Sequence, residues 1–333
     1  MSALQTHPPA WRVVLALGLL YISWGTTYLA TGAGVKTVPP LLFGGSRLFL
    51  AGLVLLGFLR LTGRRVKMSG RDFGRTWLVG VFLFVGGNGL VNVAQQTVPS
   101  GIASVLVATT PFWMALLETI SPTGERLSVR GWLGLLLGLA GVVLLTADKL
   151  SAHLGGIGVG YLLVIGSAIS WAFGAILQRR SKVAASPVAC AAWQMVLGGA
   201  SLVVLGCSLG HAQELRVERI TPTAIAAYFY LLVIGSLIGF VAFTWLLSHV
   251  SSALAGSYAY VNPVVALLVG WLIADEVLSA RVLCGMMVIL AGVALVRTGS
   301  GWRHPAVTVA VDEPKCETTP AFADATFSES GES

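Results

Sequence analysis

Arg47 is the residue whose position most restricts its chemistry. It is the single charge in the apolar run from 37 to 59. A charged side chain deep in a membrane helix costs about 2.5–3.5 kcal/mol on insertion scales, so it needs a cavity or a partner. Arg47 can anchor a carboxylate or phosphate group of a solute. Alternatively, it can clamp its helix to backbone carbonyls and to a polar neighbouring helix, and the sequence supports the two readings about equally.

A stripe of polar side chains follows in the next apolar run. Asn88, Asn92, Gln95 and Gln96 have the spacing i, i+4, i+7 and i+8, which places them on one face of a helix. Asn88 and Asn92 bracket the expected depth of Arg47, so the three side chains can form hydrogen bonds. The alternative is that the stripe joins helices, as polar residues do in membrane bundles. That structural role is preferred for Gln95 and Gln96, which are expected near the membrane interface.

Two prolines are expected to act as hinges in their helices. Pro111 and Pro263 have no backbone N–H, so each leaves a carbonyl four residues earlier without its helical partner. Such a carbonyl can bind a solute or let the helix bend, although kinks that only improve packing are common in membrane helices. The polar residues beside them that we assign to a candidate solute cavity are Thr110, Tyr258, Tyr260 and Asn262.

Aromatic residues are expected to form part of the same cavity. Trp24 and Trp171 lie well inside apolar runs, away from the interfacial belt where tryptophan concentrates. They can form a wall for flat or amphipathic solutes, with Tyr28 beside them; core packing is the alternative. Gln194 follows Trp171 at the distance at which Arg47 follows Trp24, so we assign it to the cavity as the neutral counterpart of Arg47. The cavity should then be more positive toward the periplasm.

The sequence offers little for catalysis or metal binding. The five histidines are scattered, no H-E-x-x-H motif occurs, and the four cysteines match neither a zinc pattern nor a disulfide framework. We therefore expect no cofactor, no metal and no enzyme activity. Glu118 is the one candidate for proton coupling, although its position fits a helix-end acid better. Facilitated or weakly coupled transport is expected.

The composition identifies the environment of these residues. Of 333 residues, 56% are hydrophobic and 11% are charged, and the mean hydropathy is +0.83. A water-soluble domain has about a quarter of its residues charged, so most of this surface is expected to contact membrane lipids. The net charge is +7, and the basic residues that produce it lie between apolar runs rather than in an aromatic-basic module. This pattern argues against a nucleic-acid partner.

The apolar runs predict an all-α polytopic membrane protein with ten transmembrane helices. About 20 apolar residues are needed to cross the hydrocarbon core. The runs are 13–35, 37–59, 76–117 (two helices), 131–147, 150–178, 183–213, 220–274 (two helices) and 282–296. If the helices alternate in direction, most of the 21 basic residues fall on one side, and the positive-inside rule places both termini in the cytoplasm.

Sequence matches at a nearly constant shift predict a duplicated five-helix unit. Ile22-Ser23-Trp24 returns as Ile169-Ser170-Trp171, and Pro111 corresponds to Pro263. Since five is odd, the two units must be inverted in the membrane, and the loop charges agree. Inverted repeats place a site near the midplane, between the units. The predicted parts are a cytoplasmic N-terminus (1–11), repeat 1 (12–147), a periplasmic linker (148–156), repeat 2 (157–298) and a disordered acidic cytoplasmic tail (299–333).

Four stretches carry a family resemblance: Tyr21–Tyr28, Gly87–Gly89, Val98–Ser104 and Ser257–Ala266. They resemble the EamA-type branch of the drug/metabolite transporter superfamily, closest to its YedA-like bacterial members. The resemblance implies a permease of the bacterial inner membrane, with two EamA domains around a central cavity, that exports metabolites, amino acids or drugs. We therefore expect secondary transport of a small-molecule solute by alternating access, by a monomer or homodimer. The alternative is a membrane-embedded enzyme that acts on a lipid-like substrate.

Overall fold

The computed structural model describes residues 8–98, 100–121, 124, 127–151, 158–181, 183–274 and 280–299. Within these ranges the chain is helical and contains no strand, which confirms the predicted all-α class. The elements are α1 (Ala10–Gly25), α2 (Thr27–Gly34), α3 (Pro40–Leu61), α4 (Gly70–Gly80), η1 (Val81–Gly89), α5 (Leu90–Ala94), α6 (Ser100–Val107), α7 (Thr110–Ile120), α8 (Val129–Ser151), α9 (Val159–Arg180), α10 (Pro187–Ser208), α11 (His211–Glu214), η2 (Val217–Arg219), α12 (Pro222–Tyr230), η3 (Leu231–Phe240), α13 (Val241–His249), α14 (Ser252–Gly256), α15 (Tyr258–Ala274) and α16 (Ala280–Gly299).

Six helical runs of the described chain are long and apolar enough to cross a membrane. They are Ala10–Gly34, Pro40–Leu61, Gly70–Ala94, Val159–Arg180, Pro187–Ser208 and Pro222–His249, and shorter apolar helices cover Val129–Leu144 and Leu283–Val296. The polytopic fold is thus confirmed, whereas the count of ten helices stays a prediction. The predicted tail lies outside the described residues after 299, and α8 continues to Ser151, beyond the predicted start of the linker.

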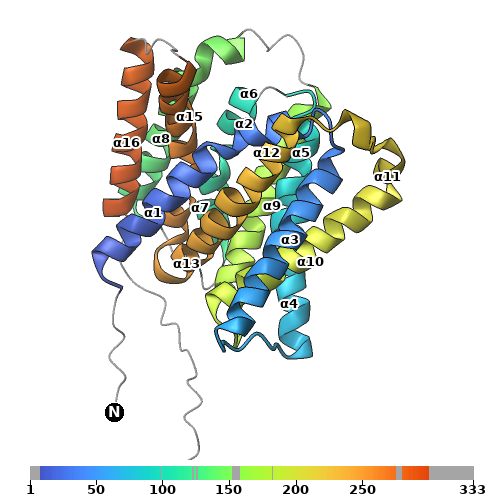
Figure 1. Cartoon of the computed structure of the whole chain (residues 1–333). Coiled ribbons are helices and arrows are strands. Elements are labelled where there is room, and N and C mark those ends of the chain that lie inside the picture. Colours follow the sequence, from blue (N-terminus) through green and yellow to red (C-terminus); the bar gives the residue numbers. More distant parts are fainter. Residues whose placement is uncertain are drawn as a thin grey trace, which may run out of the picture.

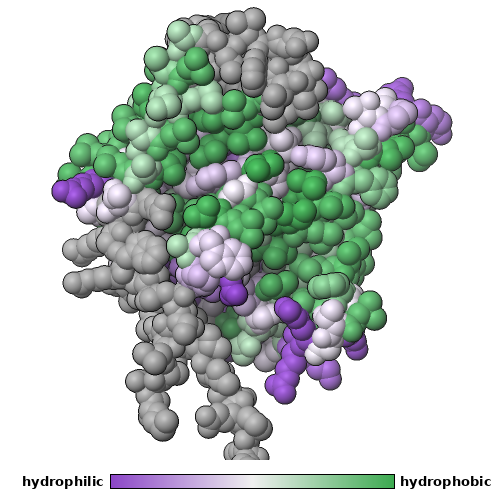
Figure 2. Space-filling view, turned by 60° about the vertical axis from the view of Figure 1, so that its left-hand side comes forward, coloured by the Kyte–Doolittle hydropathy of each residue, from purple (hydrophilic) through white to green (hydrophobic). Residues whose placement is uncertain are grey.

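The outer surface of the bundle is apolar. Large hydrophobic side chains from four different helices are more than half exposed: Leu162, Val204, Phe229 and Met287. Figure 2 shows such side chains over much of the visible face, with the most hydrophilic ones at its margins. An apolar surface of this extent is what a hydrocarbon environment requires, and water-soluble monomers do not maintain one.

Helix starts recur in the two halves of the chain. Pro40 is the first residue of α3 and Pro187 the first residue of α10, where the missing N–H costs nothing. The side chains of Ser69 and Thr221 cap α4 and α12 by accepting hydrogen bonds from backbone N–H groups three residues later. Corresponding positions therefore carry the same local signals.

Helices α3 and α10 pack against each other in opposite directions. A methyl group built on Gly45 would lie 2.9 Å from the carbonyl oxygen of Gly199, and one built on Gly52 would lie 2.8 Å from that of Ala192. Residue numbers thus rise along one helix as they fall along the other. Glycine at these positions lets the two backbones approach closely, as small residues do in membrane bundles.

Helices α8 and α16 form a second antiparallel pair through glycines. Methyl groups on Gly134 and Gly141 would come within 2.7 Å of the Val296 nitrogen and 2.8 Å of the Ile289 nitrogen. In Figure 1 this pair lies on the left of the bundle, and α3 with α10 lies on the right. Each pair is antiparallel and joins one helix from each predicted repeat, whereas the inverted repeat itself stays a prediction.

The helical runs Gly70–Ala94 and Pro222–His249 contain one π-helical segment each, η1 and η3. The two segments occupy corresponding places in the two halves, near the middle of their runs. A π-segment widens the helix and turns its side chains out of the α-helical phase, and such segments are frequent at functional sites. Both contribute to the cavity described below.

Candidate functional site

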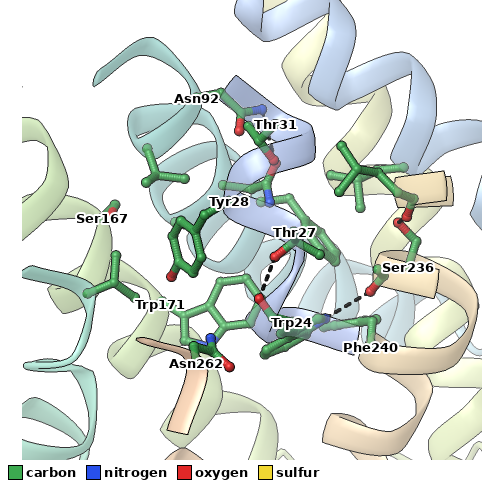
Figure 3. Close-up of a pocket in the computed structure, with 18 of the residues that line it drawn as sticks. Trp24, Thr27, Tyr28, Thr31, Asn92, Ser167, Trp171, Ser236, Phe240 and Asn262 are labelled. Atoms are coloured by element: carbon green, nitrogen blue, oxygen red, sulfur yellow. Dashed lines mark hydrogen bonds between the residues drawn. The ribbon is translucent and has the colours of Figure 1, made fainter. Parts of the chain in front are cut away.

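A cavity of about 110 Å³ lies inside the bundle. Since a buried water needs roughly 10–15 Å³ of such space, the cavity can hold several waters or part of a small solute. Its walls come from α1, α2, α3, η1, α5, α6, α7, α9, η3 and α15, and so from both predicted repeats. In Figure 3, Trp24, Thr27, Tyr28 and Thr31 project from one continuous segment, with Ser167 and Trp171 on one side and Ser236 and Phe240 on the other.

Most of the candidate site residues line this cavity. They are Trp24, Tyr28, Arg47, Asn88, Asn92, Thr110, Trp171, Tyr258 and Asn262. Five candidate positions do not line it: Pro111, Glu118, Gln194, Tyr260 and Pro263. The cavity therefore gathers side chains that are more than 200 residues apart in the sequence.

The guanidinium of Arg47 connects the two halves of the chain. Its side chain lies on α3 and is only 5% exposed. Nη1 donates to the Leu231 carbonyl oxygen at 3.2 Å and to Ser236 Oγ at 2.9 Å, both in η3. Nη2 donates weakly to Asn88 Oδ1 at 3.4 Å, and Nε is buried without a hydrogen-bond partner. Arg47 thus makes the expected structural clamp and also lines the cavity.

The polar stripe of η1 and α5 both lines the cavity and holds helices together. Asn92 donates to Asn88 Oδ1 at 3.1 Å and to the Pro40 carbonyl at 3.4 Å. Gln95 donates to the Tyr28 carbonyl oxygen at 3.3 Å, and its own side-chain oxygen is buried without a partner. The preference for a purely structural Gln95 was therefore too narrow, because this side chain also faces the cavity.

Aromatic rings form one wall of the cavity. The rings of Trp24 and Trp171 meet edge to face with centroids 5.3 Å apart, and Tyr258 contacts Trp24 at 4.6 Å in the same manner. Such arrangements align ring edges with ring faces and add to the energy of burial. Trp24 Nε1 donates to the Gly235 carbonyl at 2.9 Å (Figure 3), whereas Trp171 Nε1 is buried without a partner.

Glycines in the two π-segments make room for these tryptophans. A methyl group on Gly87 of η1 would lie 2.7 Å from the Trp171 ring, and one on Gly239 of η3 would overlap the Trp24 indole. Gly87 and Gly239 hold corresponding positions in the two halves. Each half therefore provides the glycine that makes room for the tryptophan of the other half.

Thr110 and Asn262 provide polar groups on two other sides of the cavity. The helix breaks between α6 and α7, and the Thr110 hydroxyl donates at 2.6 Å to the Val107 carbonyl that Pro111 leaves without its helical partner. The freed carbonyl is thus satisfied within the protein. Asn262 interacts with Tyr28 through its side chain, and its Oδ1 is buried without a hydrogen-bond partner.

The two prolines differ in their surroundings. Pro111 lies at the start of α7, directly after a break in the helix, so it marks a discontinuity. Pro263 lies inside α15, and the break in that run occurs earlier, at Ser257. Neither proline lines the cavity. Their role as hinges stays a prediction.

The structure places Tyr260 and Gln194 away from the cavity. Tyr260 donates to the Leu135 carbonyl of α8 at 3.2 Å, since it lies on the face of α15 opposite to Tyr258 and Asn262. Gln194 is 3% exposed and lies on α10, where its backbone contacts Gly80. Neither residue lines the cavity in this structure, and their part in a solute site stays a prediction.

Glu118 lies in an ion-pair cluster rather than in the cavity. Its Oε2 is 2.6 Å from Arg180 Nη2, and its Oε1 is 3.8 Å from Arg179 Nε. Arg179 also donates to the Val250 carbonyl at 2.7 Å, and Arg180 to the Ser121 hydroxyl. The cluster connects α7 of the first half with α9 and the α13–α14 connection of the second half.

Several lining residues were missed from the sequence. They are Thr27, Thr31, Ser167, Gly235, Ser236 and Phe240. Thr27 and Thr31 follow Trp24 at helical spacing, which could have revealed them. Ser236, Gly235 and Phe240 gave no such signal, because the π-segment η3 changes the side-chain phase.

Comparisons with known proteins give consistent results. The model of the EamA-like transporter family matches the chain twice, over residues 11–147 and 158–298. The chain is 37% identical over 289 residues to the "uncharacterized inner membrane transporter YedA" of Escherichia coli K12, covering 85% of this chain and 90% of that protein. It is 27% identical to the "uncharacterized transporter YvbV" of Bacillus subtilis, covering 88% and 93%.

Two further comparisons concern a named efflux pump and a solved structure. A "probable amino-acid metabolite efflux pump" of Escherichia coli K12 is 26% identical, with 87% of this chain and 96% of that protein covered. A solved crystal structure superposes with a TM-score of 0.70 at 20% identity and covers 87% of this chain and 98% of that one. This likeness concerns the fold alone.

Proposed function

The chain belongs to the EamA-like transporter family, and on this premise we propose that it is a secondary transporter of the bacterial inner membrane that exports small metabolites, amino acids or drugs. The observation that carries the proposal is the buried polar cavity, to which both halves of the chain contribute. Export accords with the efflux pump among the relatives. The alternative of a membrane-embedded enzyme has no comparable support, because the family and these relatives are transporters.

The position of the cavity supports a site that opens to one side at a time. Its lining residues lie in Trp24–Thr31, Arg47–Leu48, Phe84–Gln95, Val107–Thr110, Ser167–Trp171, Leu231–Phe240 and Tyr258–Asn262. With both termini in the cytoplasm, as predicted, six of these segments are the middle or the periplasmic half of their helices. Tyr258–Asn262 lies somewhat toward the cytoplasmic end of its run. The opposite half is filled by buried side chains such as Met114, Leu246 and Leu254. We assign this conformation to a state sealed toward the cytoplasm.

The inverted helix pairs supply a physical route for alternating access. Two units of like fold and opposite direction can exchange their conformations, which moves an opening from one side of a shared site to the other. The antiparallel pairs of α3 with α10 and of α8 with α16 support this arrangement. The ten-helix inverted repeat is part of the proposal.

The ion-pair cluster of Glu118 is assigned to the cytoplasmic seal. The Glu118 carboxylate is 5% exposed and lies between the side chains of Arg179 and Arg180, which come from the other half. Opening toward the cytoplasm would separate these groups. The Glu118 carboxylate pairs with two arginines and does not line the cavity, so Glu118 fits a latch better than a proton carrier.

The experiment compares metabolites released by cells that express the wild type with those released by cells that express a variant with a filled cavity. Ser167→Phe places a ring in the cavity, and Ser201→Ala, which changes a residue that does not line it, serves as the matched control. Both variants are checked for equal amounts in the membrane. We expect at least one solute in the medium to rise several-fold with the wild type and with Ser201→Ala, but not with Ser167→Phe. Equal release by all three would contradict the proposal.

A further inference from the structure

The charge of the cavity is determined by one side chain. Among the described residues that line it, Arg47 is the only one with a charge, and its hydrogen-bond acceptors are a carbonyl, a hydroxyl and an amide. The structure records ion pairs for Glu118 and Asp72, and neither of them involves Arg47. The positive charge of the cavity is thus uncompensated within the part of the chain that the structure describes.

The guanidinium also keeps one edge free. Both N–H groups of Nη1 are used by η3, whereas Nε has no partner and Nη2 has only the long contact to Asn88. The Nε and Nη2 edge of arginine is one of those that bind a carboxylate through two parallel hydrogen bonds. The clamp to η3 therefore orients Arg47 and does not exhaust its donors.

The aromatic wall lies next to this charge. Trp24 donates to the carbonyl of Gly235, and a methyl group on Gly235 would lie 3.5 Å from Arg47 Nη1. A solute whose anionic group is bound by Arg47 would place its apolar part against Trp24, Trp171 and Phe240. An ammonium group in the same space would be close to a positive charge, with no lining carboxylate in the described residues to offset the repulsion.

We propose that the cavity selects organic acids with a single negative charge and a flat apolar group, in preference to zwitterions and cations of the same shape. This inference rests on the proposed function, because it names the solute class of the same site. The Oδ1 of Asn262 has no partner, and the hydroxyls of Thr27 and Ser167 donate to the carbonyls of Trp24 and Val164. All three oxygens can accept hydrogen bonds from polar substituents of a solute without adding charge.

The test uses four compounds that share a phenyl ring and differ in charge: phenylacetate, phenylalanine, phenethylamine and phenylacetamide. Radiolabelled phenylacetate is bound to the purified full-length protein in nanodiscs and displaced by each of the other three. We expect phenylacetate to bind at least ten-fold more tightly than the zwitterion, the cation and the neutral amide. No binding of phenylacetate, or equal or tighter binding of phenylalanine or phenethylamine, would overturn the inference.

Two variants show whether the preference comes from the charge. Arg47→Gln should abolish the advantage of phenylacetate, but it also removes the clamp. Asn88 accepts a hydrogen bond from Arg47, and Asn88→Asp keeps the shape of this side chain while it adds a negative charge beside the guanidinium. It should weaken phenylacetate binding at least ten-fold and improve the binding of phenylalanine relative to phenylacetate. A misfolded variant cannot gain such a preference, and an unchanged order in Asn88→Asp would contradict the inference.

Transport assays separate this inference from the proposed function. Proteoliposomes that release phenylalanine faster than phenylacetate would support a transporter and refute the selectivity for single negative charges. Selective binding of phenylacetate, without movement of it or of any solute from the release experiment, would support the selectivity and refute the transporter. The two proposals can thus fail independently.

Discussion

The indole rings of Trp24 and Trp171 meet edge to face with their centroids 5.3 Å apart, although they lie in corresponding places of the two halves of the chain. Two corresponding residues can touch only close to the axis that relates the halves. If the predicted repeat relates the halves, the contact lies close to that axis, and both rings line the cavity. Their hydrogen bonds differ, because the Trp24 N–H has a carbonyl partner and the Trp171 N–H has none.

Replacing each tryptophan by phenylalanine should show this difference. Trp24→Phe loses the hydrogen bond to Gly235, whereas Trp171→Phe removes a buried N–H without a partner. Both variants lose ring volume, but only Trp24→Phe loses a hydrogen bond. Its free energy of unfolding should therefore be lower than that of Trp171→Phe by about 1 kcal/mol. The midpoint of thermal unfolding, followed by circular dichroism in detergent, should be lower for Trp24→Phe. Equal midpoints would contradict the asymmetry.

Adding a methyl group at Gly239 should disturb the packing of Trp24. Gly239→Ala forces Trp24 to move, and overpacking of this kind costs about 1–3 kcal/mol. Gly18→Ala is the matched control, since a methyl group there meets no atom within 4 Å. Gly18→Ala should leave the free energy of unfolding unchanged or raise it by up to about 1 kcal/mol, because alanine favours a helix. The measurement is again thermal unfolding, and a stable Gly239→Ala would refute the close contact.

Removing the charge of Glu118 should loosen the connection between the halves. Glu118→Gln leaves Arg179 and Arg180 without their carboxylate and should cost about 1.5–3 kcal/mol. The less buried pair of Asp72 and Arg75, with atoms 3.9 Å apart, provides the control. Asp72→Asn should cost less than about 1 kcal/mol.

The same two variants test the assigned latch. If the Glu118 cluster seals the cytoplasmic side, Glu118→Gln should increase the reaction of a cysteine placed at Leu254 with a membrane-permeant thiol reagent. Leu254 is buried in the packed half of the bundle. Asp72→Asn should leave the rate unchanged. Similar rates in both variants would remove Glu118 from the seal.

The inverted topology predicts opposite accessibility of two exposed connections. Lys67 precedes α4, and Glu218 lies in η2. Single cysteines at these positions, in a chain without its native cysteines, should react with a membrane-impermeant maleimide from opposite sides. Lys67→Cys should react in inside-out vesicles and Glu218→Cys in intact spheroplasts. Reaction of both from the same side would contradict the inverted repeat.

Much of the site could be predicted because charge and polarity are costly in apolar runs. Arg47, Asn88 and Asn92 were found for that reason, and Trp24 and Trp171 because the repeat relates them. Other features depend on the packing of distant segments. Nothing near Glu118 in the sequence indicates Arg179 and Arg180, about 60 residues later.

Backbone geometry explains the remaining differences. The π-segments η1 and η3 have the composition of ordinary apolar helices, so Ser236 and Phe240 could not be assigned to the cavity by α-helical spacing. Tyr258, Tyr260 and Asn262 were grouped by proximity to Pro263, although helical phase separates Tyr260 from the other two. The count of ten spans exceeds the six long apolar runs, in part because α6 with α7 and α14 with α15 are each interrupted.

Arg47 carries the only charge among the described residues that line the cavity, which bears on the energy source of the proposed transport. With a bound monoanion the cavity is electrically neutral, and after release it carries one positive charge. A cell interior that is negative by 100 mV favours the inward return of such a charge by up to about 2.3 kcal/mol, in proportion to the fraction of the field it crosses. If the protein exports monoanions as proposed, the resting voltage can therefore drive the cycle through the charge of Arg47.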